Sequence, residues 1–156
     1  MFVFFRQLAY KNAMKQTLFQ RLFGPAPTEL PPSDARIALA ALLVRIARSD
    51  GDYAQVEIAR IRQVLTTRYG LDDGDTGDLL MVAENLEREA PDTVRFTRAI
   101  KDAVPYDERI AVVESAWKVV LADGHRAHEE NALMRLIASL LGVNDRDSNM
   151  ARKRAE

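Results

Sequence analysis

Apolar residues recur with helical spacing along nearly the whole chain after residue 32. In the segment that Ser33 caps they stand three or four residues apart, which places them on one helical face: Ile37, Leu39, Ala40, Leu43, Val44, Ile46 and Ala47. No stretch alternates apolar and polar residues with the period of two that marks a strand. The pattern predicts an all-α protein without a sheet.

Glycine and proline divide this pattern into seven predicted helices. The first begins at Ser33 and stops at Gly51, and the others cover about 54–69, 78–89, 92–103, 105–121, 127–141 and the segment after Asn144. Gly70 and Gly142 each follow a helix, where glycine accepts the left-handed conformation of a helix end. Residues 72–77 are predicted to form a turn, because they combine glycines with aspartates.

The chain repeats itself at an offset of 73 residues, which lays 105–142 over 32–69. Seven of the 25 positions in 38–62 are identical to their counterparts. Asp50-Gly51 falls on Asp123-Gly124, and Glu57 falls on Glu130. We therefore expect a single helical bundle built from two related helix–turn–helix units, joined by a middle helical pair.

The first 28 residues differ in charge from the rest. They contain four basic residues and no acid, so they carry +4, whereas residues 29–156 carry −5; the sum is the net charge of −1. Five of the six phenylalanines lie among the first 23 residues. The chain is thus predicted to consist of a basic aromatic arm with a linker (1–28) and a helical domain (29–156).

The arm is predicted to be a helix over residues 2–22, ended by Gly24-Pro25. One interpretation docks its aromatic side chains on the helical domain. The other makes it an amphipathic helix that binds a membrane surface or a protein partner, with its lysines reaching toward phosphates. The candidate contact residues are Phe4, Phe5, Leu8, Lys11, Lys15 and Phe19.

Composition excludes several classes of chemistry. The chain has no cysteine, which removes disulfides, iron–sulfur clusters and thiol nucleophiles. The near-zero net charge gives no reason to expect a nucleic-acid partner. We find no secretory signal, no apolar run long enough to span a bilayer and no catalytic constellation, so we expect a cytoplasmic protein that is not an enzyme.

The two Asp-Gly turns are the candidate chemistry. Asp50 and Asp123 each stand where a helix ends, and a negative charge there costs roughly 0.3–1 kcal/mol. A divalent cation held between each of them and Glu57 or Glu130 would offset that cost. Carboxylate oxygens suit Ca²⁺ or Mg²⁺. The alternative is that these acids are only helix caps and solvated charges.

Two histidines complicate the choice of metal. His125 and His128 lie in the second turn, where the first turn has Asp52 and Gln55. They are interpreted either as solvated turn residues or as ligands, and imidazole ligands would favour Zn²⁺. Upstream of the first turn, Ile46 and Arg48 replace the acids that an EF-hand loop needs, so this turn is not an EF-hand.

These motifs resemble the TerB family, the tellurite-resistance protein B group. The resemblance rests on Leu43-Val44-x-Ile46-Ala47-x-x-Asp50-Gly51 with Glu57, on Glu114-x-x-Trp117-x-Val119-Val120-x-Ala122-Asp123-Gly124 with Glu130, and on Leu140-Leu141-Gly142-Val143. The central Arg95-Phe96-Thr97 resembles the family's middle section.

Family membership implies a bundle of about seven helices and a non-enzymatic role in stress-response complexes linked to the membrane. It also implies divalent-metal binding by the acids at the turns, Asp50, Glu57, Asp123 and Glu130, with Asp52 and Glu114 as further candidates. From its position alone, Glu114 is either half-buried and paired with an arginine or exposed. Trp117 and Phe96 are predicted core residues.

Overall fold

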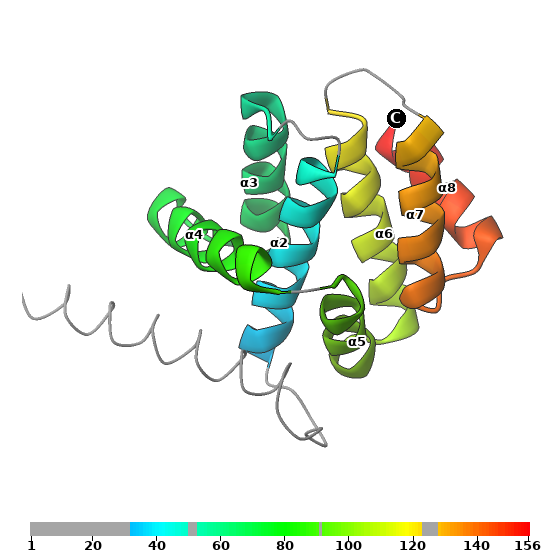
Figure 1. Cartoon of the computed structure of the whole chain (residues 1–156), viewed down its shortest axis with the longest axis horizontal. Coiled ribbons are helices and arrows are strands. Elements are labelled where there is room, and N and C mark those ends of the chain that lie inside the picture. The colour runs from blue at the N-terminus through cyan, green and yellow to red at the C-terminus, as the bar shows by residue number, and fades with distance from the viewer. Residues whose placement is uncertain (1–31, 50–52, 91, 123–127) are drawn as a thin grey trace, which may run out of the picture.

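The computed structural model describes residues 32–49, 53–90, 92–122 and 128–156. In these ranges the chain forms seven helices and no strand, so the all-α prediction is confirmed (Figure 1). The helices are α2 (Pro32–Arg48), α3 (Gln55–Tyr69), α4 (Asp73–Glu89), α5 (Val94–Ala103), α6 (Tyr106–Val120), α7 (His128–Leu140) and α8 (Asp145–Ala155).

Several predicted helix ends are confirmed by the backbone. Gly70 and Gly142 adopt φ angles of 61° and 72°, the left-handed region that glycine enters without strain. The Asn144 side chain accepts a hydrogen bond from the Asp147 N–H at 2.8 Å and so caps α8.

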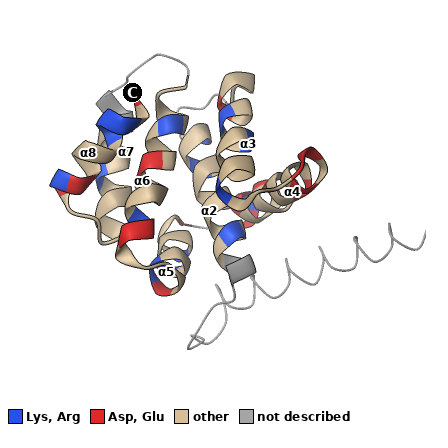
Figure 2. Ribbon diagram, turned by 180° about the vertical axis from the view of Figure 1, so that it is seen from behind, with Lys and Arg blue, Asp and Glu red and all other residues tan. Residues whose placement is uncertain are grey.

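The prediction of a turn over residues 72–77 was wrong, because α4 already begins at Asp73. The Asp72 carboxylate accepts a hydrogen bond from the Asp75 N–H at 2.7 Å and caps the helix. Acidic residues then occupy the first turn, where the helix dipole favours them, and they mark this tip of α4 in Figure 2. Capping and charge thus offset the low helix propensity of Gly74 and Gly77.

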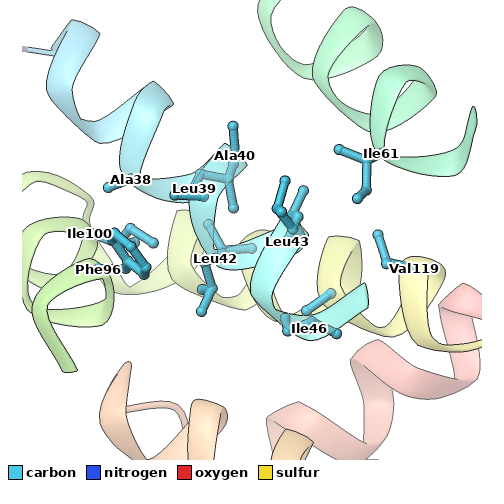
Figure 3. Packing of buried hydrophobic residues seen from close by; sticks show 14 of the residues in the cluster. Ala38, Leu39, Ala40, Leu42, Leu43, Ile46, Ile61, Phe96, Ile100 and Val119 are labelled. Atoms are coloured by element: carbon cyan, nitrogen blue, oxygen red, sulfur yellow. The ribbon is translucent and has the colours of Figure 1, made fainter. Parts of the chain in front are cut away.

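Helix α2 is the centre of the bundle. Every residue from Ile37 to Val44 is essentially inaccessible to solvent, because α3, α4, α5 and α6 all pack against it. Figure 3 shows Leu43 of α2 on the side of this helix that faces Ile61 of α3. Phe96 and Ile100 of α5 lie on another side of α2. The predictions that Phe96 (0 % exposed) and Trp117 (5 %) are core residues are confirmed.

The repeat corresponds to the pairs α2–α3 and α6–α7. The 73-residue offset carries Gln55, where α3 begins, onto His128, where α7 begins. The two pairs meet where α6 packs against α2 and α3, while α8 packs extensively along α6. The carboxyl ends of α2 and α6 and the starts of α3 and α7 lie at the same end of the bundle (Figure 1).

Several predicted residues lie outside the described ranges. They include the arm with Phe4, Phe5, Leu8, Lys11, Lys15 and Phe19, and the turn residues Asp50, Asp52, Asp123 and His125. Among the described helices, none is both long and apolar enough to cross a membrane.

Candidate functional site

The described chain on both sides of the first turn is held by helix-end hydrogen bonds. At the end of α2, the backbone N–H and the hydroxyl of Ser49 both donate to the Ile46 carbonyl, at 3.2 and 2.6 Å. At the start of α3, the Ala54 carbonyl accepts from the N–H groups of Glu57 and Ile58, at 3.1 and 3.0 Å. Residues 50–52 therefore connect two fixed helix ends.

Glu57 is the candidate ligand of the first turn that the structure describes in full. It lies in the first turn of α3, and only 5 % of its surface is exposed. An acid at this position meets the positive end of the helix dipole, which favours its charged form. A buried carboxylate needs such compensation, because loss of hydration destabilises a charge strongly.

Four charged side chains from α2 and α4 lie beside this turn. Arg45 donates three hydrogen bonds to the end of α4. Its Nε lies 3.2 Å from Glu87 Oε1, and its Nη2 lies 3.0 Å from the Glu87 carbonyl and 2.8 Å from the Ala90 carbonyl. Arg48 pairs with Glu87 at 3.6 Å and with Glu84 at 3.8 Å. These contacts fix α4 against the end of α2.

Tyr53 lies beside these charged side chains, and they shift its pKa. Its ring lies 4.9 Å from the Arg48 guanidinium, a cation–π contact. Burial of the phenol, together with the carboxylates of Glu84, Glu87 and Glu57, raises the pKa of Tyr53 to about 12, although Arg48 acts to lower it. The Tyr53 hydroxyl is itself buried without a hydrogen-bond partner in the described structure.

The donor chemistry at the first turn fits a hard divalent cation. Three carboxylates act on Tyr53 against the guanidinium group of Arg48, and Glu57 is the one of the three that belongs to the turn itself. Oxygen ligands of this kind suit Ca²⁺ or Mg²⁺. The described residues alone hold no group of three or more acidic or histidine side chains placed around a common metal position.

Glu84 and Glu87 were not predicted as members of this site. Their spacing of three residues on α4 matches the spacing of Arg45 and Arg48 on α2, so both pairs lie on one face of their helix. That matched spacing is a signal in the sequence. It does not reveal which two helices face each other, because the pairs are about 40 residues apart.

The second turn is described only at its flanks. The Ala122 N–H donates to the Val119 carbonyl at 3.2 Å at the end of α6, and α7 begins at His128 with Glu130 in its first turn. Glu114 is half-buried and accepts a hydrogen bond from Arg154 Nε at 2.9 Å. Of the two interpretations of Glu114, the structure confirms the one that pairs it with an arginine.

A family model for tellurite resistance protein TerB matches residues 36–153. The chain belongs to the TerB family. The match runs from α2 into α8 and includes both Asp-Gly turns of this TerB-family chain, so the resemblance drawn from the turn motifs and the Trp117 helix is confirmed. Neither the comparison with curated proteins nor the comparison with solved structures gives a match.

Proposed function

We propose that this TerB-family protein binds one divalent cation at each Asp-Gly turn and acts, without catalysis, as a cytoplasmic interaction module of a stress-response complex. The observation that carries the proposal is the buried Glu57, which lies in the first turn of α3 directly after the Asp-Gly turn and acts on Tyr53 together with the carboxylates of Glu84 and Glu87. Asp50 and Asp52 are the further ligands that we assign to this turn. A bound cation would offset the repulsion among these acids.

The repeat extends the proposal to the second turn. Its helix ends lie at the same end of the bundle as those of the first turn, and Glu130 takes the place of Glu57 in the first turn of α7. Asp123 and Glu130 are the oxygen ligands assigned there. His125 and His128 distinguish this turn from the first, and with them we propose that it takes Zn²⁺ more readily than the first turn does.

Thermal unfolding in saturating cation tests the proposal. A cation that binds only the folded protein at 100 times its Kd stabilises it by about 2.7 kcal/mol, which raises the Tm by roughly 5–11 °C for a chain of this size. We expect Ca²⁺, Mg²⁺ or Zn²⁺ to produce such a rise, and Asp50→Ala and Asp123→Ala each to reduce it. An identical melting curve with and without all three cations would disprove the proposal.

The arm supports a second candidate function, that of a membrane-surface or protein-partner adaptor in which the acidic turns are purely structural. Its +4 charge and its phenylalanines are the observation in favour. We expect the full chain to sediment with anionic vesicles and a chain lacking residues 1–24 to remain in solution while its melting curve is unchanged. A full chain that does not sediment contradicts the membrane form of this function.

A further inference from the structure

We propose that a pocket between α6, α7 and α8 binds a small molecule through an oxyanion, a phosphate or a carboxylate. These three helices pack together at one side of the bundle (Figure 1), and the pocket between them encloses about 460 Å³. That volume lies within the range of about 300–1,000 Å³ typical of ligand sites. The described lining residues are Trp117, Asn131, Arg135, Asp145, Ser148, Asn149 and Arg152.

Two buried hydrogen-bond donors at the wall of this pocket have no acceptor within the described structure. One is the indole Nε1 of Trp117, a residue that is only 5 % exposed, and the other is Nε of Arg152. A buried donor without an acceptor costs about 1–3 kcal/mol, so a water, an ion or a ligand is expected to accept from it in the folded protein. Two such donors line the same pocket, so a ligand with oxygen acceptors would match it.

The charges around the pocket favour an anion. Arg135 on α7 and Arg152 on α8 contribute two guanidinium groups, whose N–H groups match the geometry of carboxylate and phosphate oxygens. Asp145 is the acid in the described lining. Glu156 forms an ion pair with Arg152 at 3.7 Å from its Nε, a distance too long for a hydrogen bond to that donor.

The aromatic wall positions one of these cations. The Arg152 guanidinium lies over the Trp117 ring at 5.9 Å, and this cation–π contact limits its motion. The amide of Asn149 and the hydroxyl of Ser148 add polar groups that can donate to a bound oxyanion. The pocket therefore combines fixed charge, directional donors and a flat aromatic surface.

This inference does not rest on the proposed cation sites, because none of the proposed cation ligands is among the described lining residues. A chain that binds no cation at all leaves the pocket proposal unaffected.

Trp117 provides a direct readout, since it is the only tryptophan in the chain. The full chain is titrated at constant ionic strength with inorganic phosphate, adenosine monophosphate and citrate, with chloride as the reference salt. We expect at least one of the three anions to change the Trp117 emission in a saturable way. The three probes distinguish a free phosphate from an organic phosphate and from a carboxylate.

Three substitutions locate the binding. Arg135→Gln should weaken it at least about tenfold, because a charge-assisted hydrogen bond is worth more than the 1.4 kcal/mol that corresponds to a factor of ten. Asp145→Asn should strengthen it, because it removes the repulsive lining acid. Arg135 is exposed, so its loss should leave the fold intact, and circular dichroism checks this. Arg152→Lys keeps the positive charge at this position but removes the Nε–H donor. We therefore expect this substitution to weaken anion binding.

Arg88→Gln is the matched control. It removes the same charge from an exposed position on α4, where Arg88 contacts Asn85 and lies away from this pocket. We expect its affinity to equal that of the wild type. Equal weakening by Arg88→Gln and Arg135→Gln would show non-specific attraction and overturn the proposal. So would the absence of saturable binding for all three anions, by fluorescence and by calorimetry.

Discussion

Replacement of Glu87 by glutamine tests the ionic cluster that holds α4 to α2 beside the first turn. The substitution keeps the size and shape of the side chain and one carbonyl-type acceptor, but removes the charge. Glu87 accepts from Arg45 Nε at 3.2 Å and pairs with Arg48 Nε at 3.6 Å, and its side chain is only 11 % exposed. The two arginines would remain in a partly buried place without their shared counter-charge.

The magnitude follows from these contacts. Arg45 stays charged after the substitution and can still donate to the amide oxygen, so the loss is the charge–charge attraction of the ion pair, about 1 kcal/mol. The longer, partly exposed contact with Arg48 adds less than about 1 kcal/mol. We therefore expect Glu87→Gln to lower the free energy of unfolding by about 1–2 kcal/mol.

Urea unfolding followed by Trp117 fluorescence measures this change. The midpoint should fall while the m-value stays constant, because the surface exposed on unfolding is unchanged. Glu89→Gln is the control: it makes the same chemical change at an exposed position of the same helix, where we expect less than about 0.5 kcal/mol. If Glu87→Gln unfolds at the same urea concentration as the control, or at a higher one, the cluster does not stabilise the fold and the reasoning is refuted.

Three further predictions concern particular residues. Gly70→Ala should destabilise the protein by about 1 kcal/mol, since φ is 61° there. Gly74→Ala within α4 should stabilise it by about 0.5–1 kcal/mol. Melting temperatures of both variants equal to that of the wild type would contradict both predictions. The pKa of Tyr53 is raised to about 12 in the folded protein, whereas an unfolded tyrosine titrates near 10. The free energy of unfolding should therefore keep the full contribution of Tyr53 below about pH 10 and fall as the pH rises toward 12. Tyr53→Phe should reduce this fall and remove the tyrosine step at the highest pH from the spectrophotometric titration. Tyr106→Phe should lower the Tm, because the Tyr106 hydroxyl donates to Asp147 at 2.6 Å and joins α6 to α8; an unchanged Tm would show that this bond does not stabilise the docking of α8.

Most of the fold could be predicted from the sequence because its determinants are local. Helical periodicity, the glycines after α3 and α7 and the Asn144 cap all act within one or two turns of chain. The start of α4 was missed because its glycines suggest a turn, whereas the Asp72 cap and the acidic first turn outweigh them. The repeat identified both helix pairs, since an internal offset needs no knowledge of packing.

The candidate site could be predicted only in part. Glu57 was found because its position after Asp-Gly recurs at Glu130. Glu84 and Glu87 were not found, because they reach the first turn by the packing of α4 on α2, and packing between helices depends on the whole bundle. The pocket beside Trp117 was missed for the same reason: its cations come from α7 and α8, and its indole from α6.

Calorimetric titration of the full chain with Ca²⁺, repeated with Mg²⁺ and Zn²⁺, measures cation binding at the two turns. We expect saturable binding of one cation per turn, with one site lost in Glu57→Gln, the other lost in Glu130→Gln, and both retained in Glu89→Gln. Absence of saturable binding for every cation, or binding that survives in a chain carrying both Glu57→Gln and Glu130→Gln, would contradict this expectation.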